Sequence, residues 1–204
     1  MMKNIFIISI ILLNINLFSQ ENYKYRIGRT WNDVTKMEEY SIIKKNGDTI
    51  RKLDSQKYIV SLQVEFNDFA IFSIKDKKGW SAIDINEIFL FQVYNRLPGE
   101  PFPDYLIENR IRVIGENNKI GFANSNGKIV IKPQFETVTE FNNGFAIFQI
   151  ECTKIENDVA SGQHHGFHYE CAKAGYIDKN GKIIEIGDFE FNEIKEKINW
   201  KGEN

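Results

Sequence analysis

Hydrophobic and polar positions recur in one pattern along the chain, and the pattern is most complete in residues 121–148, GFANSNGKIVIKPQFETVTEFNNGFAIF. A glycine–aromatic pair is followed by a polar turn, a β-branched run that stops at Pro133, and an aromatic segment. An Asn-Gly step between apolar runs is a strong hairpin signal, because both central residues of a type I′ turn need a positive φ. Since β-branched and aromatic residues favour strands, the pattern predicts short antiparallel strands.

Parts of this pattern are found again before and after it. Residues 66–72 (FNDFAIF) match residues 141–148 (FNNGFAIF) except for one acid/amide change and one missing glycine. Glycine–aromatic pairs stand at 79–80, 121–122 and 175–176, and Asn-Gly steps stand at 46–47, 126–127 and 180–181. An internal repeat of this kind predicts a tandem array, here of three to four units over residues 41–191. A closed propeller with a similar period is the alternative arrangement.

The remaining segments carry weaker signals. Residues 20–40 predict a small N-terminal arm, either a short helix capped near Thr30 or an irregular segment that packs Trp31 on the first repeat. Residues 58–64 alternate as a strand with one apolar face. Three of the four prolines lie in 97–103, which predicts a surface loop in preference to a domain linker. Residues 190–197 form a closing helix or a frayed strand, and residues 192–204 are expected to be a C-terminal tail.

The pattern G-aromatic-x4-G-K-I-V-I-x-P-x-F, followed by F-x-x-G-x-A-x-F, resembles the WG-repeat proteins of bacteria. Gly121, Phe122, Pro133, Gly144 and Phe148 are among the residues that match it. Residues 175–182 match in part, and residues 79–84 form a degenerate unit without the Asn-Gly turn. The resemblance implies a tandem all-β array with a binding or scaffolding role, and it implies no catalytic residues.

The start of the chain predicts export. Lys3, an apolar run over 5–13 and Ser19 form a secretory signal peptide over residues 1–19, with cleavage before Gln20. The apolar run is shorter than the roughly 20 residues of a spanning helix, so no membrane span is expected in the mature chain. We therefore expect a periplasmic or secreted protein.

Charge is balanced, with 26 basic and 28 acidic residues interspersed. This distribution differs from the basic stripe of a nucleic-acid-binding protein, so no nucleic acid is expected as a partner.

The segment from 151 to 173 lengthens one spacing of the repeat and carries unusual chemistry. It holds both cysteines of the chain, Cys152 and Cys171, and all three histidines, His164, His165 and His168. Export and an even cysteine count predict a disulfide. A zinc site is the alternative, but the two glycines nearby disfavour a helical histidine pair and the spacing matches no zinc motif. We expect no metal, and we take the three histidines as candidate partner contacts on an exposed tip.

Catalytic motifs are missing from the sequence. It contains no G-x-S-x-G, no H-E-x-x-H and no phosphate-binding glycine loop, so we expect neither an enzyme nor a cofactor. Carboxylate pairs such as Glu136 with Glu140, or Asp76 with Asp84, are more simply explained as solvated charge.

Two function classes remain. The first is an exported interaction or scaffolding module for an unknown protein or envelope component. The second is a carbohydrate- or peptidoglycan-binding protein, including a cryptic hydrolase. Exposure of Trp80, Phe122 and Tyr176 beside carboxylates favours the second class, and their burial favours the first.

Overall fold

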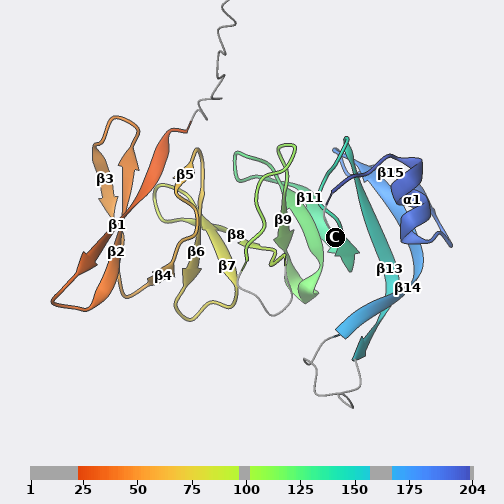
Figure 1. Cartoon of the computed structure of the whole chain (residues 1–204), viewed down its shortest axis with the longest axis horizontal. Coiled ribbons are helices and arrows are strands. Elements are labelled where there is room, and N and C mark those ends of the chain that lie inside the picture. The colour runs from red at the N-terminus through yellow and green to blue at the C-terminus, as the bar shows by residue number, and fades with distance from the viewer. Residues whose placement is uncertain (1–22, 97–101, 157–166, 203–204) are drawn as a thin grey trace, which may run out of the picture.

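The computed structural model describes residues 23–96, 102–156 and 167–202, and it shows four three-stranded antiparallel units along the long axis of the molecule (Figure 1). Unit 1 contains β1 (Tyr25–Asn32), β2 (Met37–Lys44) and β3 (Thr49–Lys52); unit 2 contains β6 (Ala70–Ile74), β7 (Trp80–Ile83) and β8 (Phe89–Val93); unit 3 contains β9 (Ile111–Ile114), β10 (Ile120–Ala123) and β11 (Ile129–Phe135); unit 4 contains β13 (Phe145–Glu156), β14 (Phe167–Asp178) and β15 (Ile183–Gly187). The prediction of an all-β array of short antiparallel strands is confirmed.

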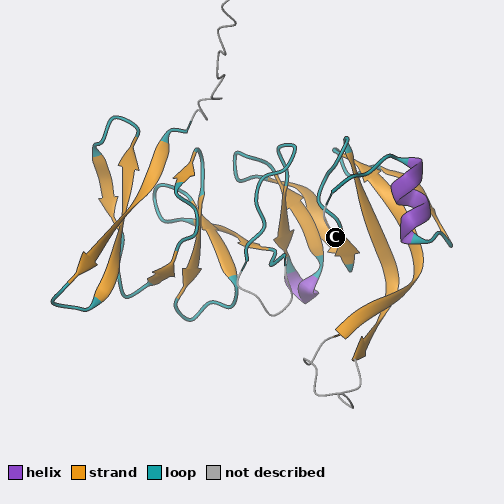
Figure 2. Ribbon diagram, in the orientation of Figure 1, coloured by secondary structure: helices purple, strands orange, loops and turns teal. Residues whose placement is uncertain are grey.

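Short elements connect these units: β4 (Tyr58–Val60), β5 (Glu65–Phe66), η1 (Glu116–Asn118), β12 (Thr137–Val138) and α1 (Phe191–Lys197). Three sheets result, with strand orders β3-β2-β1-β5, β11-β10-β9-β8-β7-β6-β4 and β12-β13-β14-β15. Strands dominate the described chain (Figure 2). Units 1 and 4 lie at opposite ends of the long axis, so the array is open and the closed propeller is wrong.

The hairpins after the second strand of units 1, 3 and 4 use the Asn-Gly steps, but with a different turn from the one expected. Gly47, Gly127 and Gly181 have φ between 75° and 99°, whereas the asparagine before each glycine is not left-handed. The glycine N–H donates to the carbonyl three residues back, as from Gly127 to Asn124 (2.9 Å). This is a three-residue loop, in which a type I turn is followed by a left-handed glycine.

Unit 2 makes the same turn without glycine. Glu87 takes the left-handed position with φ 65°, and the Asp84 carboxylate accepts hydrogen bonds from the backbone of Asn86 and Ile88 (2.8 Å each). The corresponding side chain, Asn124 in unit 3 or Asp178 in unit 4, accepts the same pair of bonds. The second unit is therefore structurally complete, although its sequence is degenerate.

Strand register changes which residues of the units are equivalent. Counted from the turn, Ser81 and not Gly79 is the counterpart of Gly121, since Ala82 pairs with Phe91 as Phe122 pairs with Ile131. Ser41 and Gly175 occupy the same position in units 1 and 4. Positions 41, 81 and 121 are 40 residues apart, and the longer step to 175 contains the extended β13–β14 hairpin.

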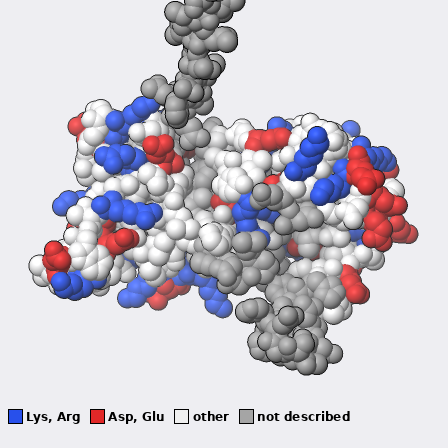
Figure 3. All heavy atoms as spheres, in the orientation of Figure 1, with Lys and Arg blue, Asp and Glu red and all other residues white. Residues whose placement is uncertain are grey.

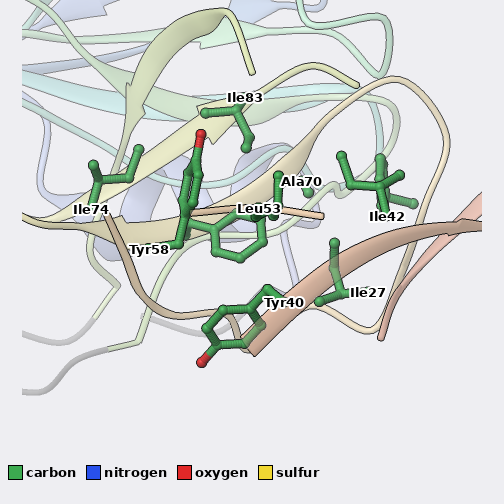
Figure 4. Packing of buried hydrophobic residues seen from close by; sticks show 10 residues of the cluster. Ile27, Tyr40, Ile42, Leu53, Tyr58, Ala70, Ile74 and Ile83 are labelled. Atoms are coloured by element: carbon green, nitrogen blue, oxygen red, sulfur yellow. The ribbon is translucent and has the colours of Figure 1, made fainter. Parts of the chain in front are cut away.

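Four clusters of buried side chains hold the units together, and each lies where one unit meets the next element. The cluster between units 1 and 2 joins Ile27, Tyr40 and Ile42 to Ala70 and other residues of β6 and β7 (Figure 4). Two further clusters join unit 2 to unit 3 and unit 3 to unit 4. A fourth packs unit 4 against α1 and Trp200, so the helix covers the face that a fifth unit would cover.

This stacking explains the repeated Phe-Ala-Ile-Phe. In β6, Ala70 and Phe72 face unit 1 while Ile71 faces unit 3. In β13, Ala146 and Phe148 face unit 3 while Ile147 faces α1. Both faces of each strand are buried, so the sequence is apolar at successive positions instead of alternating.

The predicted N-terminal arm is wrong as a helical or irregular segment. Residues 25–44 form the β1–β2 hairpin, and Trp31 is 57% exposed instead of packing on the first repeat. The Asn32 side chain accepts hydrogen bonds from the N–H groups of Val34 and Thr35, as an N-cap would, but the chain reverses there. Asx turns and helix caps share this hydrogen bond, so the local sequence fits both.

Two other predictions are corrected. In residues 58–64 only Tyr58–Val60 is a strand, and Leu62 and Val64 are 48% and 59% exposed, so the proposed apolar face is not buried. The closing helix expected at 190–197 is present as α1, whose Glu190 and Glu193 form a capping box, but a tail over 192–204 is wrong, because α1 includes residues 192–197 and Trp200 beyond it is buried.

Some predictions fall outside the described ranges. The signal peptide over 1–19 and most of the proline-rich loop lie there. Among the residues that are described, no helix is long and apolar enough to cross a membrane.

Candidate binding groove

A groove of about 500 Å³ lies where unit 3 meets unit 4, within the size range of ligand sites. One side is formed by the chain after β8 and by residues 102–105, and the other by β12, β13 and α1. Its lining residues are Tyr94, Arg96, Phe102, Pro103, Tyr105, Arg112, Thr137, Val138, Thr139, Ile147, Gln149 and Phe191.

Arg112 is held rigidly in this groove. Its Nε and Nη2 atoms donate to the two carboxylate oxygens of Asp104 (3.0 Å each), and Nη1 donates to the carbonyl of Val138 (3.2 Å). The guanidinium also stacks on the ring of Tyr94, 4.5 Å from its centroid. Asp104 is 2% exposed, so this is a buried bidentate pair that connects unit 3 to β12.

Arg96 forms a second pair on the same side of the groove. Its Nη2 lies 3.1 Å from Glu140, and its guanidinium lies 4.3 Å from the centroid of the Tyr105 ring. Burial alone would lower the pKa of Arg96, but the hydrogen bond with Tyr105 and the charge of Glu140 outweigh it and raise that pKa. Trp200 donates its indole N–H to the Glu140 carbonyl (3.2 Å), which fixes this wall to the C-terminal segment.

Two kinds of group remain accessible in the groove. Tyr105 and Phe102 are 53% and 49% exposed and present aromatic rings. The Thr137 hydroxyl donates to the side-chain oxygen of Gln149 (3.2 Å), which leaves the Gln149 amide NH2 as a donor without a partner in the described part of the chain. The groove can therefore combine contact with an aromatic ring and hydrogen bonding at one place.

The predicted disulfide is present. Cys152 and Cys171 lie opposite each other in the β13–β14 ladder with an S–S distance of 2.09 Å. Their Cα atoms are 3.9 Å apart, closer than the roughly 4.4–6.8 Å that is usual for disulfides. The Cys152 N–H points away from β14 and donates to Glu136 (2.8 Å), so the cysteines form a non-hydrogen-bonded pair, the closer of the two kinds.

The predicted histidine contacts are only partly placed. His168 lies in β14, opposite Ile155, while His164 and His165 lie outside the described residues. Over residues 23–96, 102–156 and 167–202, no group of three or more His, Cys, Asp or Glu side chains is arranged to hold a metal ion.

The aromatic residues that the sequence offered as a sugar platform are core residues. Trp80, Phe122 and Tyr176 are 5%, 1% and 9% exposed and lie in three separate clusters. The two carboxylates of the proposed pair Glu136 and Glu140 bind different cations. Glu136 pairs with Lys119 (2.8 Å) and Glu140 pairs with Arg96.

Sequence reasoning missed the groove residues, although one signal was available. Arg112 interrupts the apolar run of residues 111–114, at the position that Ile27, Ile71 and Ile147 occupy in the other units. A single arginine inside a buried strand requires a buried partner, and Asp104 supplies it.

Comparison with known families decides the identity of the repeat. Residues 120–151 match the sequence model of a family described as WG containing repeat. The chain contains a WG repeat. The matched stretch covers β10, β11, β12 and the first part of β13, so the WG repeat joins two strands of one unit to the first strand of the next. No curated protein and no solved structure matches the chain.

Proposed function

We propose that this WG-repeat protein is an exported, non-enzymatic interaction module that binds a protein or envelope component through the groove between units 3 and 4. The observation that carries the proposal is the groove itself: a hollow of about 500 Å³ with two half-exposed aromatic rings, whose wall is held by one buried and one partly buried ion pair. A preorganised wall reduces the ordering that binding would otherwise require.

The state of the carboxylates supports a non-enzymatic role. General acid–base catalysis needs a carboxyl group within reach of a substrate. Asp104 is buried and accepts two hydrogen bonds from Arg112, and Glu140 pairs with Arg96. These two acids therefore serve to hold arginines at the groove.

Carbohydrate binding is the second candidate. The three aromatic residues that the sequence suggests as a sugar platform, Trp80, Phe122 and Tyr176, are buried and present no face to a sugar. Tyr105 and Phe102 provide a different aromatic surface, at the groove.

The proposal is tested by site-specific photo-crosslinking in the intact cell envelope, followed by mass spectrometry. A photoreactive residue at Phe102 should capture a partner, whereas one at Trp31, similarly exposed but in unit 1, should not. Equal capture from both positions would contradict a binding site at the groove.

Export is tested separately. The mature protein should begin at Gln20, as measured by N-terminal sequencing of protein from the periplasm or the medium. Retention of the intact N-terminus in the cytoplasm would remove the exported part of the proposal.

A further inference from the structure

We infer that the groove binds a neutral saccharide unit of an envelope glycan, an inference that rests on the proposed function and names the chemistry of its partner.

The two arginines of the groove do not favour a charged ligand, because each is paired with a carboxylate. Arg112 is neutralised by Asp104 in a bidentate pair, and Arg96 lies 3.1 Å from Glu140. An anionic ligand would have to approach these two carboxylates as well as the arginines. A cationic ligand would meet both guanidinium groups. A neutral ligand disturbs neither pair.

The accessible groups fit the two surfaces of a sugar ring. A pyranose has a face of C–H groups, which packs on an aromatic ring, and a rim of hydroxyls that both donate and accept hydrogen bonds. Tyr105 and Phe102 offer half-exposed rings on one side of the groove. On the other side, the Gln149 amide offers a donor, and the Thr137 hydroxyl is an acceptor.

An extended peptide fits less well. The natural template for a peptide strand here is β12, which is the edge of the last sheet. Thr139 donates its N–H toward β13, so Val138 directs its carbonyl outward, and Arg112 Nη1 already binds that carbonyl (3.2 Å). Strand addition needs unpaired edge groups, so this edge is a poor template.

The size of the groove agrees with a short glycan segment. A volume of about 500 Å³ lies in the range that holds one small-molecule ligand. The glycan would therefore be recognised through one or two sugar rings.

The test is a titration of the mature full-length protein with neutral trisaccharides of glucose, galactose and N-acetylglucosamine, followed by amide NMR shifts. At least one should shift amides of β12 and β13. Tyr105→Ala should raise its Kd about tenfold, because one aromatic contact is lost. Tyr105→Phe keeps the ring and loses the hydroxyl that bonds Arg96, so its Kd should lie closer to that of the wild type than to that of Tyr105→Ala. Trp31→Ala is the matched control, because it removes a similarly exposed ring from unit 1.

The outcomes separate this inference from the proposed function. If no trisaccharide shifts groove amides, or if Tyr105→Ala binds as tightly as the wild type, the saccharide inference is wrong. Capture of a protein from Phe102 in that case would preserve the interaction module and identify a protein as its partner. Failure of both the titration and the crosslinking would overturn both proposals.

Discussion

At the residue scale, two glycines of the WG repeat are needed for different physical reasons. Gly144 has φ 84° in a two-residue turn with Asn143, and a Cβ added there would meet nothing within 4 Å. Gly121 has no left-handed backbone, but its Cβ would lie 2.4 Å from the Ile131 carbonyl oxygen. One position needs backbone freedom, and the other needs empty space.

Alanine substitutions should distinguish backbone strain at Gly144 from a steric clash at Gly121. Gly144→Ala should cost about 1–2 kcal/mol of unfolding free energy from left-handed strain. Gly121→Ala should cost about 3 kcal/mol or more, because the contact is with backbone that cannot move aside easily. Urea denaturation measures both values. Asparagine tolerates the left-handed region, so Gly144→Asn should recover stability and Gly121→Asn should not. Equal rescue at the two positions would contradict this distinction.

Glu136 should make the protein less stable in acid. The hydrogen bond from Lys119 and then that from the Cys152 N–H lower the pKa of Glu136 below its usual value. Since an unfolded glutamate has a pKa of about 4.3, these contacts stabilise the fold above that pH. The stabilisation is lost as the pH falls through the folded-state pKa.

Glu136→Gln should therefore reduce the difference in stability between pH 7 and pH 3, measured by urea denaturation. Glu65→Gln, which changes an exposed carboxylate of β5, is the control and should leave that difference unchanged. An unchanged pH dependence in Glu136→Gln would show that other carboxylates account for the acid sensitivity.

The loops show which turns can be predicted from local sequence and which cannot. Asn-Gly steps correctly located three of the four loops that join the second and third strands of the units, because few residues accept a positive φ. The loop of unit 2 was missed because Glu87 occupies that position. Tyr58 donates to its carboxylate (2.9 Å) and Arg51 pairs with it (3.4 Å), contacts that accompany its left-handed backbone. Those partners lie 29 and 36 residues away in sequence, so no local pattern shows them.

At the scale of elements, the β13–β14 hairpin depends on its disulfide. The bond closes a loop with a sequence separation of 19 residues, which the chain-entropy estimate values at roughly 3 kcal/mol. Cys152→Ser with Cys171→Ser should lower the unfolding free energy by about that amount. Reduction of the wild type should have a similar effect and serves as the control. Intact-mass measurement of exported protein should show no free thiols, and two free thiols would contradict the assignment.

Element type was predictable where both faces of a strand pack against neighbours, as in residues 145–148. It failed in residues 25–37, where polar residues at a turn fit a helix cap and a hairpin equally. The prediction also failed for residues 61–64, because the side chains of Leu62 and Val64 remain exposed. The Val64 carbonyl accepts a hydrogen bond from Ile27 of β1, but this contact involves the backbone alone. The structure of such segments depends on packing against another unit, and the sequence of one segment does not show that packing.

At the scale of the whole molecule, each buried cluster belongs to two neighbouring elements, so no unit has a core of its own. The face of the molecule seen in Figure 3 shows charges of both signs spread over both ends. The groove arises only from this stacking, because Arg96, Tyr105 and Gln149 are brought together from three separate segments. The repeat pattern predicted the stacking, but it could not predict a site formed by residues that differ between units.

Coupling between units 3 and 4 should depend on Arg112. Arg112→Met leaves the Asp104 carboxylate buried without its charge partner, a change that typically costs about 3–5 kcal/mol. It also removes the hydrogen bond to Val138, which belongs to the sheet of unit 4. In an array whose units contact only their neighbours, the loss should appear mainly at that junction.

Peptide-resolved hydrogen exchange would measure the loss of stability at the junction between units 3 and 4. Exchange should rise in β12, β13 and α1 of Arg112→Met while β1, β2 and β3 remain protected. Arg51→Met is the matched control, because Arg51 pairs with Glu87 between units 1 and 2 at a more exposed site and should contribute about 1 kcal/mol or less. Adding Asp104→Leu to Arg112→Met removes the uncompensated charge and should restore part of the protection. A uniform rise over all four units would instead mean that the array unfolds as one cooperative body, with the buried pair stabilising the whole molecule and not one junction.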